Sequence, residues 1–169
     1  MNSQSPNILA DDPLIQDYDE KKMEDVYDFS IDPFVKAEHY DVVKSWWSLY
    51  YGGDIFPEKC VPDNGVVVCH AGKPVASCFI YANESKFCHI GFSMVDPAHK
   101  AGKRIFFLRK CIEATLERAK ELVGEDAVIW SLTDHAVVAR VYREKGIHCL
   151  GEGDLFAYAK NTDDLEFLT

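Results

Sequence analysis

The chain of 169 residues carries 18 lysines and arginines against 28 aspartates and glutamates, a formal net charge of −10, and 47% of its residues are hydrophobic. This length and composition predict one folded domain with one core and exclude a charge-rich disordered chain. The acidic balance argues against nucleic acid as a partner, because phosphate neutralisation supplies most non-specific affinity. The sequence shows no membrane-spanning run and no secretion signal, so we expect a cytoplasmic protein.

Residues 1–25 are rich in aspartate and glutamate, and we expect them to form a solvated, partly disordered leader outside the core. Residues 26–169 are then expected to form the single domain. The six cysteines include no CxxC pair and the six histidines lack zinc-ligand spacing, so no metal site is predicted. Isolated cysteines within apolar runs are expected to be reduced and buried.

Hydrophobic periodicity and turn residues divide the rest of the chain into strands and helices. In chain order we predict a strand at 26–34, a helix at 37–51, strands at 65–71, 74–82 and 87–95, a helix marked by apolar residues over 105–123, a strand at 127–132, a helix from a Thr133 or Asp134 cap to Gly146, and a hairpin of strands at 147–150 and 155–160. Short polar links between the three middle strands indicate an antiparallel meander.

Residues 97–112 contain five basic residues and no acidic one, in contrast to the acidic chain around them. The five are Lys100, Lys103, Arg104, Arg109 and Lys110. Basic residues at the start of a helix oppose the helix dipole, so we expect an anion to compensate them there. A strand, a loop containing Gly102 and a helix start form a phosphate cradle. The alternative is a solvated basic turn.

Three segments resemble motifs of the GCN5-related N-acetyltransferase (GNAT) family. They are Val95-Asp96-Pro97 at the end of a strand, KAGKRI over 100–105 in the place of the pyrophosphate loop, and HAVVARVYREKGI over 135–147. The resemblance spans about residues 26–160. It implies an α/β (α+β) GNAT fold, a single mostly antiparallel mixed sheet of about seven strands flanked by helices, with splayed central strands.

The resemblance also implies that acetyl-coenzyme A (acetyl-CoA) is the cofactor. The backbone of Ser93, Met94 and Val95 would pair with its pantetheine arm. The residues implied at the pyrophosphate and the adjoining helix are Lys100, Ala101, Gly102, Lys103, Arg104, Ile105, His135 and Tyr142. Lys103 and Ile105 stand where the family has small residues, and His135 replaces an asparagine.

For catalysis, the resemblance places Tyr142 near the coenzyme sulfur, where its phenol can protonate the departing thiolate. A backbone N–H of Met94 or Val95 would stabilise the oxyanion of the tetrahedral intermediate. His89 is the candidate general base, because imidazole has a suitable pKa and its even spacing from Val95 predicts that both lie on one strand face. Glu84, Asp134 and ordered water are the alternatives.

These residues predict an acetyl-CoA-dependent N-acetyltransferase, an acyltransferase that acts on a primary amine of a small molecule or protein by direct attack. Trp46, Trp47, Tyr50 and Tyr51 are candidate aromatic walls for the acceptor, although Trp47 also fits a core position. Glu152 and Asp154 could attract its cationic amine. A catalytically weak GNAT-fold binding or regulatory module is the alternative, and an acidic mimic of nucleic acid is the third class. The sequence does not determine the oligomeric state, and a homodimer is one candidate.

Overall fold

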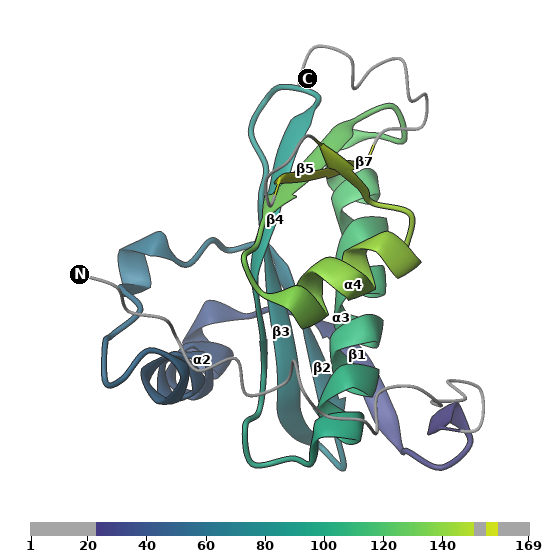
Figure 1. The fold of residues 1–169 in the computed structure, drawn as a ribbon. Helices are drawn as coiled ribbons and strands as arrows, with labels where there is room; N and C mark the ends of the chain where they lie inside the picture. Colours follow the sequence, from purple (N-terminus) through teal and green to yellow (C-terminus); the bar gives the residue numbers. More distant parts are fainter. Residues whose placement is uncertain (1–22, 151–154, 159–169) are drawn as a thin grey trace.

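The computed structural model describes residues 23–150 and 155–158. Its elements are β1 (Phe29–Pro33), α2 (Lys36–Tyr50), the 3-10 turn η2 (Glu58–Cys60), β2 (Gly65–His70), β3 (Lys73–Tyr81), β4 (Phe87–Val95), α3 (Ala101–Val123), β5 (Val128–Leu132), α4 (Ala136–Glu144), β6 (His148–Leu150) and β7 (Leu155–Tyr158) (Figure 1). Their order is the predicted one. The first strand starts at Phe29, later than expected, and the long helix starts at Ala101, before its first predicted apolar residue. The hairpin tip at 151–154 lies outside the described residues.

The strands form one seven-stranded sheet in the order β1-β2-β3-β4-β5-β7-β6. Strands β1 to β4 pair antiparallel with their neighbours, which confirms the meander. β4 and β5 pair parallel, and β7 pairs antiparallel with both β5 and β6. The predicted mostly antiparallel mixed sheet is therefore confirmed.

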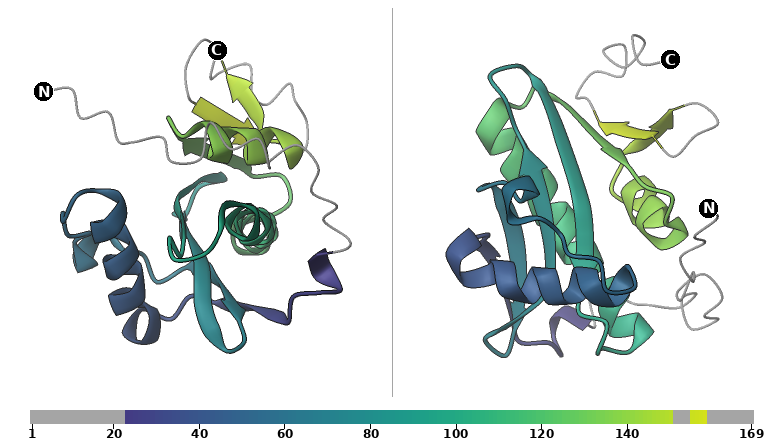
Figure 2. Two further views of the ribbon diagram at one scale, coloured as in Figure 1. Left: turned by 60° about the horizontal axis from the view of Figure 1, so that its bottom comes forward. Right: turned by 90° about the vertical axis from the view of Figure 1, so that its left-hand side faces the viewer.

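The two parallel strands separate along their length. β4 and β5 pair from Phe87↔Val128 to His89↔Trp130, and no further pair joins them within the described chain. The remainder of β4 runs away from β5, as the right-hand view of Figure 2 shows. This splay, expected from the family resemblance, leaves one edge of β4 without a strand partner over residues 90–95.

A bulge in β4 accompanies the splay. Gly91 pairs with Phe79 and Met94 with Ser77, so β4 holds one more residue than β3 between these pairs. Phe92 in the bulge has a φ of 54°, a conformation that is unusual for a bulky residue. An extra residue shifts the alternation of side chains between the two faces of a strand.

Two cores cover the two faces of the sheet. The first core lies between the sheet and α3 with α4, and includes Ile90 and Val95 of β4. The second lies between the sheet and α2, and includes Val43, Trp46 and Met94. Figure 1 shows α2 on one side of the sheet, with α3 and α4 on the other. Hydrophobic burial on both faces thus holds β4 at the centre of the fold.

Packing decides which of the sequence expectations about burial hold. Cys78, Cys88 and Cys111 are fully buried as expected, whereas Cys60 and Cys149 are exposed.

No helix among the described residues is long and apolar enough to cross a membrane.

The end of the acidic leader touches the domain. Met23 packs against the first core, and Glu24 forms an ion pair with Lys110. The expectation that residues 1–25 stay outside the core is therefore wrong for Met23. Residues 1–22 lie outside the described residues.

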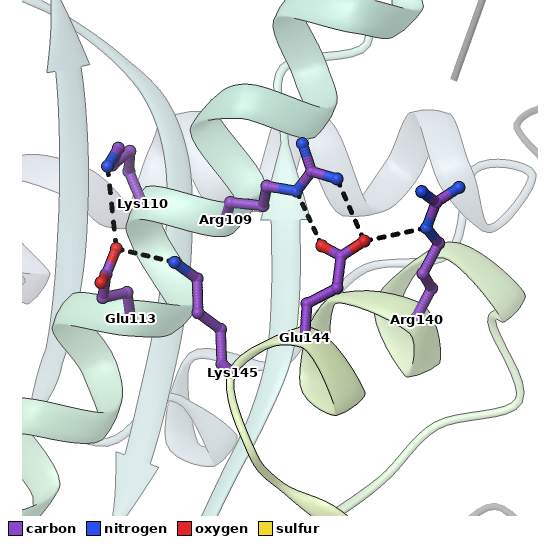
Figure 3. A network of polar contacts seen from close by, with 6 residues as sticks. All are labelled: Arg109, Lys110, Glu113, Arg140, Glu144 and Lys145. Atoms are coloured by element: carbon purple, nitrogen blue, oxygen red, sulfur yellow. Dashed lines mark hydrogen bonds and ion pairs between the residues drawn. The ribbon is translucent and has the colours of Figure 1, made fainter. Parts of the chain in front are cut away.

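Ion pairs join α3 to α4 (Figure 3). Arg109 donates two hydrogen bonds to Glu144, at 2.8 and 3.1 Å, and Arg140 donates one to the same carboxylate at 2.9 Å. Lys145 pairs with Glu113 at 3.0 Å, and Lys110 lies 3.7 Å from the same carboxylate. Two of the five clustered basic residues, Arg109 and Lys110, therefore serve the packing of α3, because they lie more than one turn beyond its start.

Neutralising Glu144 is expected to loosen α4. Burial alone would raise the pKa of Glu144, but hydrogen bonds and charges from Arg109 and Arg140 outweigh it and lower the pKa below the ordinary 4.5. We expect Glu144→Gln to reduce the free energy of unfolding by about 1 kcal/mol at neutral pH, since a bidentate network exceeds an isolated surface pair. Urea denaturation measures this change.

The control is Glu121→Gln, which removes the more exposed pair with Arg118 and should change the free energy of unfolding by no more than about 0.3 kcal/mol. A carboxylate with a lowered pKa stabilises the fold above its unfolded pKa and loses that effect as the pH falls through its folded pKa. The difference between wild type and Glu144→Gln should therefore shrink below pH 4.5. A constant difference across that range would contradict the assignment.

Candidate functional site

Two helices begin beyond the carboxyl ends of the diverging strands β4 and β5. β4 and β5 are parallel, so their carboxyl ends lie at the same end of the sheet, and each leads into a helix, α3 or α4. Ligands of α/β sheets bind in such crevices, outside the carboxyl ends of diverging strands. We call the space between the end of β4 and the end of β5 the splay mouth.

The start of α3 offers backbone donors to the splay mouth. The N-cap residue Lys100 makes no side-chain capping bond. The helical ladder opens with Arg104 N–H, which donates to Lys100 O at 3.0 Å. The N–H groups of Ala101, Gly102 and Lys103 come before that bond, and such groups, together with the helix dipole, suit an anion.

Arg104 and Tyr50 meet beside the end of β4. Tyr50 of α2 donates its hydroxyl to Val95 O at 2.7 Å. Burial raises the pKa of Tyr50, and the guanidinium of Arg104 acts in the opposite direction, so the two groups lie close together. From the sequence, Tyr50 is expected only as an aromatic wall, because nothing in its helical spacing indicates a bond to a strand residue 45 positions away.

The alternation of β4 decides which backbone groups face the splay. Asp96 N–H donates to Val75 O of β3 at 2.8 Å, so the preceding residue, Val95, directs its backbone groups to the opposite side. The bond from Tyr50 to Val95 O agrees with this direction. Of the two predicted oxyanion donors, Val95 therefore faces the splay and Met94 faces β3.

Other predicted loop residues point elsewhere. The Lys103 ammonium lies over the rings of Tyr27 and Phe107, at 5.1 and 5.7 Å. Ile105 is 3% exposed and belongs to the first core, so its side chain is not at the splay mouth. Lys100 is exposed at the helix start. Consecutive helical residues point in different directions, about 100° apart, which separates Lys103 and Ile105 from Arg104.

Buried polar atoms test whether this site fits an anionic cofactor. Among the described residues, three buried side-chain atoms lack a hydrogen-bond partner: Arg104 Nε, His135 Nδ1 and Ser77 Oγ. Arg104 is in the first turn of α3, and His135 directly precedes α4, so two of the three atoms flank the splay mouth. Unpaired buried polar groups cost free energy, which a ligand with hydrogen-bonding groups would recover. The residues present therefore fit a phosphate-bearing cofactor.

Tyr142 lies on the α4 side of the splayed strands. Its side chain is 1% exposed, and its oxygen accepts a hydrogen bond from Ser131 Oγ of β5 at 2.9 Å. Burial raises the pKa of Tyr142 strongly, with smaller opposite effects from Ser131 and Ser93, so the phenol keeps its proton. Ser93 in turn donates to Cys78 Sγ at 3.2 Å. Neither serine hydroxyl was predicted to support Tyr142.

His89 lies on the opposite face of the sheet, at the last residue pair before the splay. Its ring packs between Tyr81 and Trp130, at centroid distances of 5.4 and 4.4 Å. Tyr81 belongs to the α2 side, whereas Val95 belongs to the first core. The prediction that His89 and Val95 share a face is therefore wrong, because the bulge reverses the alternation between them.

The imidazole of His89 extends toward the bulge. A Cβ atom on Gly91 would lie 2.8 Å from Cε1 and 2.9 Å from Nε2 of His89, so glycine makes room for the ring. Burial lowers the pKa of His89 below 6.5, which keeps the imidazole neutral at neutral pH and able to accept a proton.

Glu84 lies in the turn before β4, at the paired end of β4 and β5. The strand rise of about 3.3 Å per residue separates it from Ser93 by about 20 Å or more. The structure thus does not bring Glu84 to the splay mouth. The general-base candidates that remain near the splay are His89 and Asp134.

The predicted aromatic walls divide between core and surface. Trp46 is buried in the second core, whereas Trp47 is half-buried and stacks on the exposed Tyr51. Two aromatic residues that the sequence analysis did not select, Phe92 and Trp130, also lie on this face. Glu152 and Asp154 lie outside the described residues.

The fold agrees with that of solved acetyltransferase structures. One of them is a GNAT family acetyltransferase from Brucella melitensis in complex with acetyl-CoA, with a TM-score of 0.59 and 13% identity. The match covers 80% of this chain and 90% of the other. The chain has the GNAT fold. A GNAT family N-acetyltransferase from Escherichia coli in complex with CoA shares this fold, with a TM-score of 0.57, 11% identity and coverage of 83% and 86% of the two chains.

A probable acetyltransferase from Staphylococcus epidermidis has a TM-score of 0.60 at 12% identity, and the match covers 79% of this chain and all of the other. No protein-family model and no curated protein sequence matches the chain. The GNAT fold is thus evident in the three-dimensional arrangement while sequence identity is low.

Proposed function

We propose that the chain is a cytoplasmic N-acetyltransferase that transfers the acetyl group of acetyl-CoA to a primary amine. The observation that carries this proposal is the splay mouth of the GNAT fold, where Arg104 Nε at the start of α3 and His135 Nδ1 at the start of α4 are buried without partners among the described residues. Arg104 and the N–H groups of residues 101–103 would hold the pyrophosphate, and the unpaired edge of β4 would hold the pantetheine arm.

When bound, acetyl-CoA supplies an acetyl thioester that an amine can attack. The N–H of Val95 would hold the thioester oxygen, because its direction is set by the pairing of β4 with β3. His89 lies six residues before Val95 on β4, so it would take through ordered water the proton that the amine loses as the nitrogen–carbon bond forms. Tyr142, on the other side of the sheet, would give a proton to the sulfur as the carbon–sulfur bond breaks. His89 and Tyr142 would thus act from opposite faces of the sheet.

Calorimetry and turnover with acetyl-CoA test this proposal. We expect saturable binding, and an increase in the free energy of unfolding of about 2.7 kcal/mol at 100 times the dissociation constant. We also expect release of CoA when a mixture of primary amines is added. Binding without transfer to any amine would favour the alternative, a GNAT-fold binding module. If the protein neither binds acetyl-CoA nor releases CoA, that result would contradict both the enzyme and the binding module.

A further inference from the structure

A stack of aromatic rings ends at the surface beside the C-terminus of α2. Tyr51 stacks on Trp47 with centroids 4.1 Å apart and planes inclined by 27°, and Trp47 stacks on Phe56 at 4.5 Å and 15°. Phe56 is 3% exposed, whereas Tyr51 is 48% exposed. The stack therefore begins in the second core and ends in solvent at Tyr51, where one more flat ring can continue it.

The exposed end of this stack adjoins the bulge of β4. Phe92 is 41% exposed, and its ring lies 5.6 Å from Trp47 and 5.0 Å from Phe56. The positive φ of Phe92 is a strained conformation for this residue type, and the ring contacts on the α2 side account for its persistence. Apolar surface thus extends from Tyr51 to the strand position between His89 and Val95.

The same face of the sheet continues across the splay on β5. Trp130 lies beside His89, and Leu132, two residues further on the same face, is 60% exposed. α2 packs on β3 and β4, on the same face of the sheet as Trp130. The rings of Tyr51, Phe92 and Trp130 therefore all lie on the α2 side of the sheet.

Asp134 adds a carboxylate to the residues on this side of the splay. Asp134 follows Leu132 in the loop before α4, and it is exposed. Burial raises the pKa of Tyr51, and the negative charge of Asp134 raises it further, so the carboxylate lies within electrostatic range of the outer ring of the stack. Among the residues that the structure describes, no lysine or arginine forms an ion pair with Asp134. An ammonium group beside Tyr51 would therefore find a carboxylate and π-faces together.

From this arrangement we propose that the acceptor is a primary amine on a flat aromatic body, an arylalkylamine. Its ring would continue the Tyr51–Trp47–Phe56 stack, and Asp134 would attract its ammonium group. The ammonium would lose one proton to solvent, and His89 would take the second proton as the neutral amine attacks. This inference rests on the proposed acetyl transfer and names its substrate class. A lysine side chain or an aliphatic amine would bury apolar surface there but would not extend the stack.

Steady-state kinetics with matched amines tests the inference. 2-Phenylethylamine and 2-cyclohexylethylamine have the same carbon skeleton, but only the first ring is flat and aromatic. We expect kcat/KM to be about 5-fold higher for the phenyl compound, the equivalent of an aromatic pair beyond its burial. Tyr51→Leu should abolish this preference, and Tyr51→Phe should keep it. Asp134→Asn should raise KM for both amines, more at low salt.

Leu49→Ala is the control, because Leu49 is an exposed apolar residue of the same helix outside the stack. Quenching of tryptophan fluorescence by 2-phenylethylamine in the presence of CoA provides a binding readout that does not depend on turnover. Equal kcat/KM for the two amines, a higher kcat/KM for a lysine peptide, or a phenyl preference unchanged in Tyr51→Leu would overturn the inference while leaving acetyl transfer intact. No CoA release with any amine would overturn both.

Discussion

Replacement of His89 by glutamine is expected to lower kcat by about 100-fold or more, the usual loss when a positioned general base is removed. Glutamine keeps approximate size and polarity but cannot accept the proton of the attacking amine. His89 lies at the apex of the splay on the α2 side, where its ring reaches over Gly91 toward the bulge. Steady-state kinetics with saturating acetyl-CoA measures the effect.

The pH profile distinguishes a catalytic role from a packing role. A base must be neutral to accept a proton, so activity should fall as the pH falls through the pKa of His89, which burial lowers below 6.5. His89→Gln should lose this inflection. Gly91→Ala should also lower kcat, because its Cβ would displace the imidazole. The control, His148→Gln, changes an exposed histidine on β6. An unchanged kcat and pH profile in His89→Gln would assign proton removal to Asp134 or water.

Replacement of Arg104 by glutamine is expected to raise the dissociation constant of acetyl-CoA by about 10-fold to 100-fold, since hydrogen bonds to charged groups contribute about 1.5–3 kcal/mol. The buried Nε of Arg104 lacks a partner among the described residues and lies at the splay mouth. Isothermal titration calorimetry measures the change. The loss should be greater at low salt, where the lost charge is less screened.

Lys103→Gln is the matched control for this variant. It removes the same charge from the same helical turn, but the Lys103 ammonium lies over Tyr27 and Phe107. We expect the dissociation constant to change by less than about 3-fold, the effect of a single screened charge. Equal losses in the two variants would show that net charge, and not the position of Arg104, determines binding.

Local sequence patterns determined the order of the elements and much of the fold. Apolar periodicity depends on neighbouring residues alone, so the meander, the long helix α3 and the helix carrying Tyr142 could be predicted before any contact was known. Val95-Asp96-Pro97 also placed the end of β4 correctly. The splay and the seven-stranded sheet followed from the family resemblance.

Tertiary structure decided which residues can reach the site. One extra residue in β4 placed His89 and Val95 on opposite faces, and strand pairing, which creates a bulge, cannot be read from spacing. Arg109 and Lys110 form ion pairs with carboxylates of α4 and of the leader, whereas Arg104 lies beside Tyr50 of α2. The five cations form one cluster along the chain but separate in space, because a helix turns consecutive side chains in different directions and distant segments supply their partners.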